Sequence, residues 1–155
     1  MSEVDRTFES NWDFRAFDWP EQDAIVAGGD LEVSTILGAY SQGLFPMPAH
    51  GELLWWSPVE RGVLGPGDLR VSSSLRRSMR DFTFTVNEEF ETVIKQCADP
   101  SRPGGWIDAE IEAAYIRLHH AGWAHSIETR DQSGELVGGL YGVLVGGLFC
   151  GESMF

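Results

Sequence analysis

Cysteine is scarce in this chain, and long apolar stretches are missing. Its two cysteines, Cys97 and Cys150, are too few and too far apart for the disulfide framework of a secreted domain or for a zinc site. The acidic, polar N-terminus has no apolar segment, so no secretory signal is expected. The longest apolar run, residues 136–150, is rich in glycine and too short to span a bilayer. These absences favour a cytoplasmic location.

Basic residues are also few. The chain has 11 lysines and arginines against 24 acidic residues, a formal net charge of -13. Such a protein is not expected to coat nucleic acid non-specifically, because that requires a positive surface. The charge is nevertheless uneven: residues 1–32 carry nine acids and two bases, whereas residues 61–80 carry five arginines and one aspartate. The arginine-rich segment is therefore the expected docking place for a polyanion.

The familiar catalytic motifs are absent from the sequence. No serine or cysteine lies in a G-x-S-x-G elbow, and there is no P-loop, no H-E-x-x-H and no dinucleotide-binding G-x-G-x-x-G. His119 and His120 are adjacent on a predicted helix, so their side chains point about 100° apart and cannot hold one metal ion together. A solvated or core-edge position is the simpler interpretation of both.

Hydrophobic periodicity and turn residues predict an α+β fold. Asn87 and Asp108 are expected to cap helices, and Gly122 to end the second of these. Helices are expected over about 33–42, 72–80, 88–98 and 108–121. Strands are expected over 53–58, 82–86, 123–130, 135–145 and 148–155.

Proline and glycine mark the expected irregular segments. Residues 43–51 contain two prolines and two glycines, which predict a loop, and a Pro-Gly turn predicts a linker over 61–69. A domain boundary is therefore expected near residue 65. It would separate a small N-terminal domain, residues 1–64, from a second domain, residues 65–155.

Three tryptophans and one carboxylate are the best candidates for a binding site. Trp55, Trp56 and Trp106 flank glycine- or proline-bearing loops, where an indole could stack on a nucleobase, an interaction of roughly 1–3 kcal/mol. Core packing is the simpler alternative for these rings. Glu152 lies in an otherwise apolar strand; either it faces solvent, or it is buried and meets a cation or an amino group.

Several strings carry a resemblance to a known family. They are GGDLEVSTILGAYSQGLFPM, LLWWSPVERGVL, RVSSSLRRSMR, GGWI, AYIRLHHAGWAHSIE, ELVGGLYGV and GGLFCGESMF, in this order from about residue 27 to the last residue. Together they resemble the leucyl/phenylalanyl-tRNA–protein transferase family. The resemblance implies a small N-terminal domain followed by an α/β domain of the acetyltransferase-like (GNAT) fold.

The same resemblance implies an activity. Members of the family move Leu, Phe or Met from aminoacyl-tRNA to proteins whose N-terminal residue is Arg or Lys, and so mark those proteins for degradation. They use no metal and no organic cofactor. The expected partners are therefore aminoacyl-tRNA and such acceptor proteins, with no membrane, and a monomer is expected.

Site residues follow from the resemblance position by position. Trp106 would stack on the terminal adenosine of the tRNA, Phe149 and Met154 would wall a slot for the aminoacyl side chain, and Glu152 would orient polar groups of the aminoacyl-adenosine. Many members have tryptophan where this chain has Met47, so the second side of the adenine site would be a thioether. Four arginines would contact tRNA phosphates: Arg70, Arg76, Arg77 and Arg80.

The family sequence continues beyond GESMF, so the chain resembles a C-terminally truncated member with an incomplete GNAT-like domain. The family's proposed proton-relay Asp and Gln would lie beyond Phe155, and no catalytic residue is assigned. One alternative is a truncated, non-enzymatic fragment that only binds the aminoacyl-tRNA end. Another is an acetyl-CoA-dependent acetyltransferase. It is disfavoured because its pyrophosphate-binding R/Q-x-x-G-x-G/A pattern is absent.

Overall fold

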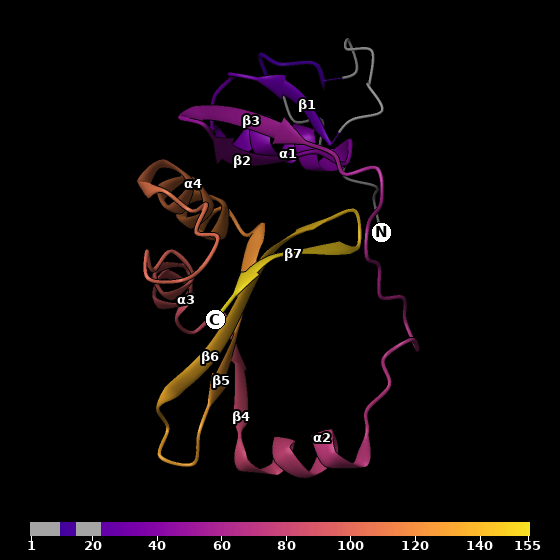
Figure 1. Ribbon diagram of the computed structural model, residues 1–155, viewed down its shortest axis with the longest axis vertical. Coiled ribbons are helices and arrows are strands. Elements are labelled where there is room, and N and C mark those ends of the chain that lie inside the picture. Colours follow the sequence, from indigo (N-terminus) through magenta and orange to yellow (C-terminus); the bar gives the residue numbers. More distant parts are fainter. Residues whose placement is uncertain (1–9, 15–22) are drawn as a thin grey trace.

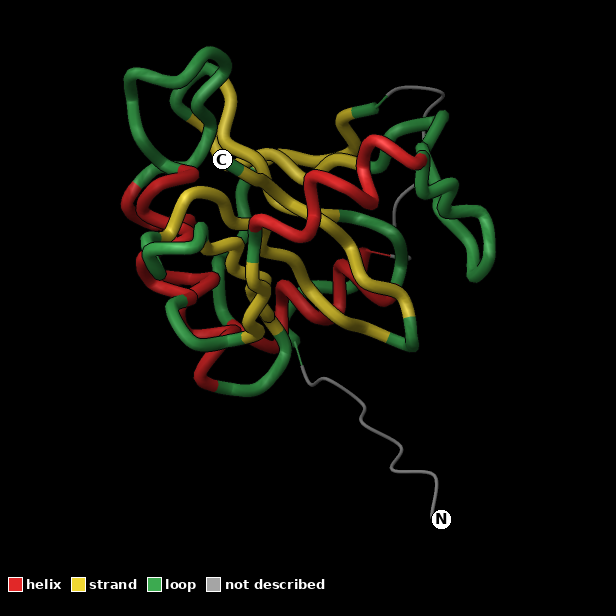
Figure 2. The backbone as a smooth tube through the Cα atoms, turned by 90° about the horizontal axis from the view of Figure 1, so that it is seen from below, coloured by secondary structure: helices red, strands yellow, loops and turns green. Residues whose placement is uncertain are grey.

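The structure is a computed structural model that describes residues 10–14 and 23–155. The described residues form helices and two antiparallel sheets (Figure 1), which confirms the α+β class. The elements are, in chain order, β1 (Ala24–Ala27), α1 (Val33–Ser41), β2 (Phe45–Ala49), β3 (Glu52–Trp56), α2 (Ser73–Ser78), η2 (Met79–Asp81), β4 (Thr83–Val86), α3 (Phe90–Cys97), α4 (Ala109–His120), β5 (Ala124–Arg130), β6 (Leu136–Val145) and β7 (Leu148–Met154). Seen from below, strands cross the middle of the molecule and most loops lie at its rim (Figure 2).

The first sheet has the strand order β1-β3-β2 and is built around a buried tryptophan. The indole Nε1 of Trp55, on the central strand, donates to the Gly28 carbonyl at 2.8 Å. The Phe14 ring packs on this indole with a centroid separation of 4.9 Å. Helix α1 buries Ile36 and Leu37 in the same core. These residues belong to a core cluster that also contains residues of the second sheet and its helices, such as Tyr115 and Tyr141.

Strand β2 shows that the loop expected over 43–51 was wrong. It pairs antiparallel with β3, from Phe45↔Trp56 to Ala49↔Glu52. Proline is tolerated in a strand at the edge of a sheet because the donor it lacks is not needed on the outer side. Strand β2 occupies such an edge, so its two prolines do not prevent pairing. Strand β1, at the opposite edge, was not predicted.

The second sheet has the strand order β4-β5-β6-β7, all antiparallel. Helices α3 and α4 lie on one side of it (Figure 1). Along β5 and β6, Ser126, Glu128, Tyr141 and Val143 are buried, while Ile127 on the alternate side is exposed. The alternation is that of a sheet with one covered face.

Helix caps show one correct and one wrong expectation. The carboxylate of Asp108 accepts hydrogen bonds from the N–H groups of Glu110 and Ile111 at the start of α4, as predicted. Helix α3, however, begins at Phe90, and Asn87 does not cap it. Asn87 adopts a φ of 61°, and its amide oxygen accepts from the Ser126 N–H at 3.0 Å. It therefore holds the turn after β4 against β5.

A stretch without regular structure, residues 57–72, links the two sheets. We call it the linking segment. It leads to α2 and η2, which contain no buried residue and lie at the foot of the molecule in Figure 1. The domain boundary near residue 65 falls in this segment and stays a prediction. Within the described residues, no helix combines the length and apolarity needed to cross a membrane.

Candidate functional site

A cavity of about 600 Å³ is lined by the α1–β2 region, the linking segment, the loop before α4 and β7. Its volume falls in the range of small-molecule sites, roughly 300–1,000 Å³. The residues important for its chemistry are Tyr40, Met47, Arg61, Trp106, Phe149 and Glu152. They come from segments far apart in the sequence, so the cavity exists only in the folded chain.

The structure brings together four of the five substrate-contacting residues expected from the resemblance. Met47, Trp106, Phe149 and Glu152 all line the cavity. Met154 does not line it: its side chain is 63% exposed, and the residue pairs with Leu140 on β6. The expected phosphate-contacting arginines 70, 76, 77 and 80 are exposed on the linking segment, α2 and η2, and do not line the cavity either.

Glu152 occupies a β-bulge. Tyr141 pairs with Ser153 and Gly142 pairs with Gly151, so Glu152 is an extra residue on β7. A bulge bends its strand and re-aims a side chain. The close approach requires glycine on the partner strand, because a Cβ at Gly142 would lie 2.3 Å from the Cys150 carbonyl oxygen. The bulge explains how a carboxylate within an apolar strand faces the cavity.

One buried phenol, that of Tyr40, holds the Glu152 carboxyl group, and a second, that of Tyr115, supports Tyr40. Tyr40 from α1 donates a hydrogen bond to Glu152, and its hydroxyl lies 2.7 Å from that of Tyr115 on α4. The Tyr115 ring in turn packs edge-on against Tyr141 of β6, with centroids 5.5 Å apart. Glu152 is therefore fixed at the end of a polar connection that joins α1 to α4.

Burial raises the pKa of Glu152 to about 7, although the hydrogen bond from Tyr40 and the charge of Arg61 favour the ionised form. Near neutral pH this carboxyl group can therefore take up or release a proton. Burial and the charge of Glu152 raise the pKa of Tyr40 and Tyr115 well above the ordinary value for tyrosine. Both phenols stay protonated and can donate hydrogen bonds.

Arg61 is the cationic residue of the cavity wall. Its Nη2 donates to the carbonyl oxygen of Gly43, just after α1, and to the Ser57 Oγ at 3.2 Å. The sequence indicated Arg61 only as part of the charge of residues 61–80, and Tyr40 only as part of the helix expected over about 33–42. The one signal available was their place in the strings STILGAYSQG and WWSPVERGV.

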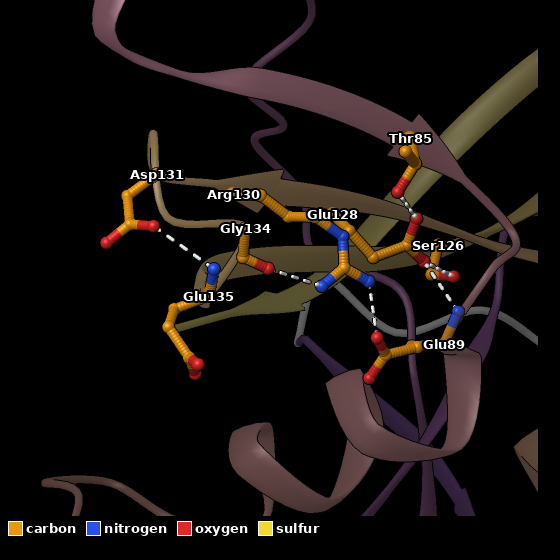
Figure 3. Close-up of polar contacts among 8 residues, drawn as sticks. All are labelled: Thr85, Glu89, Ser126, Glu128, Arg130, Asp131, Gly134 and Glu135. Atoms are coloured by element: carbon orange, nitrogen blue, oxygen red, sulfur yellow. Dashed lines mark hydrogen bonds and ion pairs between the residues drawn. The ribbon is translucent and has the colours of Figure 1, made fainter.

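A fully buried carboxylate, Glu128, lies outside the cavity lining (Figure 3). It accepts hydrogen bonds from the Ser126 Oγ at 2.5 Å, the Thr85 Oγ1 at 2.7 Å and the Glu89 N–H at 3.3 Å. Burial alone would raise the pKa of Glu128, but these hydrogen bonds hold it below its ordinary value. Because the Glu89 N–H begins α3, the carboxylate also lies at the positive end of that helix.

Around this carboxylate, Arg130 extends the polar network (Figure 3). Arg130 forms an ion pair with Glu89 and donates to the Gly134 carbonyl at 3.2 Å. The network joins β4, β5 and the start of α3, so its role is to hold the covered face of the sheet to its helix. The string AHSIE contained Glu128, but no pattern in the sequence predicted its burial.

The cavity thus combines an indole, apolar side chains, a half-buried carboxyl group and a guanidinium group. An indole can stack on a planar ring, and the carboxyl group at Glu152 can bind an amino or hydroxyl group. In the described part of the chain, no group of three or more histidine, cysteine, aspartate or glutamate residues is placed to hold a metal ion. The arrangement suits binding and orientation of a ligand that is part ring, part apolar and part polar.

Comparison with known proteins identifies relatives of the chain. Residues 63–155 match the family model described as leucyl/phenylalanyl-tRNA protein transferase, and residues 29–59 match that of its N-terminal domain. Curated relatives carry the name leucyl/phenylalanyl-tRNA–protein transferase. The protein from Yersinia enterocolitica is 49% identical over 134 residues, which cover 84% of this chain and 56% of the relative.

Two further relatives with this name give the same result. The protein from Shewanella pealeana is 45% identical over 152 residues, covering 91% of this chain and 64% of the relative. The protein from Pectobacterium carotovorum is 51% identical over 134 residues, covering 84% and 57%. The chain therefore spans between 56% and 64% of the length of these three relatives.

Proposed function

Because the chain belongs to the leucyl/phenylalanyl-tRNA–protein transferase family, we propose that its cavity binds the aminoacylated 3′ end of a tRNA. The bound aminoacyl group, Leu, Phe or Met, is transferred to proteins whose N-terminal residue is Arg or Lys. The observation that supports this best is the convergence of Trp106, Phe149 and Glu152 on one cavity. Each offers the chemistry that one part of an aminoacyl-adenosine requires.

Trp106 takes the adenine ring by stacking, with the Met47 thioether as the second apolar contact. Phe149 contacts the aminoacyl side chain, which explains a preference for large apolar amino acids. Glu152 holds polar groups of the aminoacyl-adenosine. Met154, exposed on β7, has no part in this assignment.

The proposed reaction needs little covalent chemistry from the protein. The aminoacyl ester is already activated: the acceptor's α-amino nitrogen forms the new C–N bond, the ester C–O bond breaks, and the tRNA oxygen leaves with a proton. Holding amine and ester together supplies much of the rate. The acceptor must first lose a proton from its ammonium group, and Glu152, with a pKa of about 7, can take it. This explains a site without a serine or cysteine nucleophile.

The test is transfer of labelled leucine from Leu-tRNA to an Arg-initiated peptide, run beside binding of charged and uncharged tRNA. Transfer supports the full proposal. Binding without transfer would leave only the binding part, which is the alternative that the sequence offered. Absence of both would contradict the assignment of the cavity.

Replacing Trp106 with alanine is expected to weaken binding of an adenosine-terminated RNA by roughly 1–3 kcal/mol, because base stacking is lost. Trp106→Phe should retain part of the affinity, since it keeps an aromatic face. Trp12→Ala is the matched control, because Trp12 is exposed and does not line the cavity. Titration of the RNA against each variant measures the effect, and equal affinities for wild type and Trp106→Ala would contradict the stacking role.

Reversing the charges of Arg76 and Arg77 to glutamate is expected to weaken tRNA binding and to reduce its salt dependence. Each lost phosphate contact reduces the magnitude of the slope of log K against log salt by about 0.9 on a duplex, so the loss of both contacts reduces it by nearly two. Lys95→Glu, on an exposed part of α3, is the charge control. A slope unchanged from wild type would place these arginines outside the tRNA contact.

A further inference from the structure

We propose that Arg61 binds the phosphodiester that joins the last two nucleotides of an RNA 3′ end in the cavity. This rests on the proposed function and adds a contact to it. Trp106 and Glu152 then recognise the terminal nucleoside and its aminoacyl group, while Arg61 recognises the point at which the RNA chain enters.

The charges of the cavity wall support this role. Its carboxyl and basic side chains are those of Glu60, Arg61 and Glu152, so Arg61 is the single cation against two carboxyl groups among the described lining residues. A phosphodiester that enters the cavity would face net repulsion if Arg61 were neutral. An anionic ligand at this site therefore requires the guanidinium group.

The guanidinium group is also held ready for a ligand. Its Nη2 is fixed by the Gly43 carbonyl and the Ser57 hydroxyl, which lie on the two chain segments beside it. Its Nη1 and Nε make no hydrogen bond to another described residue. These two groups point to opposite edges of the planar guanidinium group, so either one can donate to a phosphate oxygen, and a cation already held in place loses little entropy on binding.

The position of Arg61 gives the bound RNA a direction. Its side chain is exposed although the residue lines the cavity, so it lies at the mouth, whereas Glu152 is buried deeper. The linking segment continues from Arg61 toward Arg70 and the arginines of α2. RNA that leaves the cavity past Arg61 would therefore enter the most basic part of the chain.

The test compares two probes on the 155-residue chain: adenosine, and the dinucleotide cytidylyl-(3′→5′)-adenosine, which adds one phosphodiester. Binding is followed by NMR titration of the Trp106 indole N–H. Arg61→Gln should weaken binding of the dinucleotide about tenfold and leave binding of adenosine unchanged. Arg61→Lys should give an intermediate loss, because it keeps the charge but lacks the guanidinium group that Gly43 and Ser57 hold in place. Lys95→Gln is the control and should change neither probe.

Salt dependence provides a second readout. Wild type should bind the dinucleotide with a log–log salt slope of about −0.7, the value for one contact to a single strand, and Arg61→Gln should bring it near zero. Equal wild-type affinities for both probes would overturn the role of Arg61 and leave the proposed function standing. An equal loss of affinity for both probes in Arg61→Gln would also overturn this role, because it would indicate that Arg61 acts only on the structure. If neither probe bound wild type, the proposed function itself would fail.

Discussion

Replacing Glu128 with alanine should lower the free energy of unfolding by about 3 kcal/mol. The carboxylate accepts from Ser126, Thr85 and the Glu89 N–H. Without it these donors lose their acceptor in a buried place, and an unsatisfied buried group costs about 1–3 kcal/mol. Urea denaturation measures the change. Glu135→Ala, at an exposed position of the same region, should stay within about 0.5 kcal/mol of wild type.

The pH dependence of the stability of a further variant, Glu128→Gln, tests whether Glu128 is ionised. Its pKa in the folded chain is lowered, below a usual value of about 4.3. The carboxylate therefore stabilises the fold fully above that value, and this contribution is lost as the pH falls through the folded pKa. Between about pH 7 and pH 3, the stability difference between wild type and Glu128→Gln should shrink. A difference that is constant over this interval would show that Glu128 is neutral when folded.

The second large effect is expected at Tyr115. Its replacement by alanine should cost about 3–5 kcal/mol, the usual range for removal of a buried aromatic ring. Tyr115 is fully buried between Tyr40 and Tyr141. A loss below about 1 kcal/mol on urea denaturation would mean that the surrounding core collapses into the space and that the ring is dispensable.

Tyr115→Phe separates the hydroxyl from the ring. It fills the same space but removes the 2.7 Å contact with Tyr40, so the expected cost is about 1 kcal/mol. Tyr40 also donates to Glu152, and its orientation should become less fixed. We therefore expect weaker binding of an aminoacyl-adenosine analogue by Tyr115→Phe, in excess of its small effect on stability. Unaltered ligand affinity would show that Tyr40 needs no support from Tyr115.

The sequence predicted the elements whose signals are local. Helix α4 has an Asp108 cap and apolar residues at helical spacing, and it forms where expected. Strand β2 was missed because proline excludes a central strand but not an edge strand, and edge position depends on the order of strands in the sheet. The start of α3 was misplaced because Asn87 is engaged by Ser126, a residue of a distant strand.

The candidate site was predictable only in part, and for a similar reason. Trp106, Phe149 and Glu152 were expected from the family resemblance, and the fold brings them to one cavity. Tyr40 and Arg61 were not expected there, because a buried tyrosine on a helix looks like core and an exposed arginine looks like surface. Their roles depend on which segments meet, which is a property of the folded chain.

The bulge on β7 makes this strand sensitive to length rather than to composition. In a regular strand, even-numbered residues face one side of the sheet and odd-numbered residues face the other. Phe149 and Met154 nevertheless pair with Leu144 and Leu140, which lie on the same side of β6. The extra residue, Glu152, lies between them and shifts the alternation of side chains by one position. A single insertion or deletion within residues 148–154 would exchange the faces of every side chain beyond it. Variation in this strand should therefore be confined to substitutions, with the number of residues held constant.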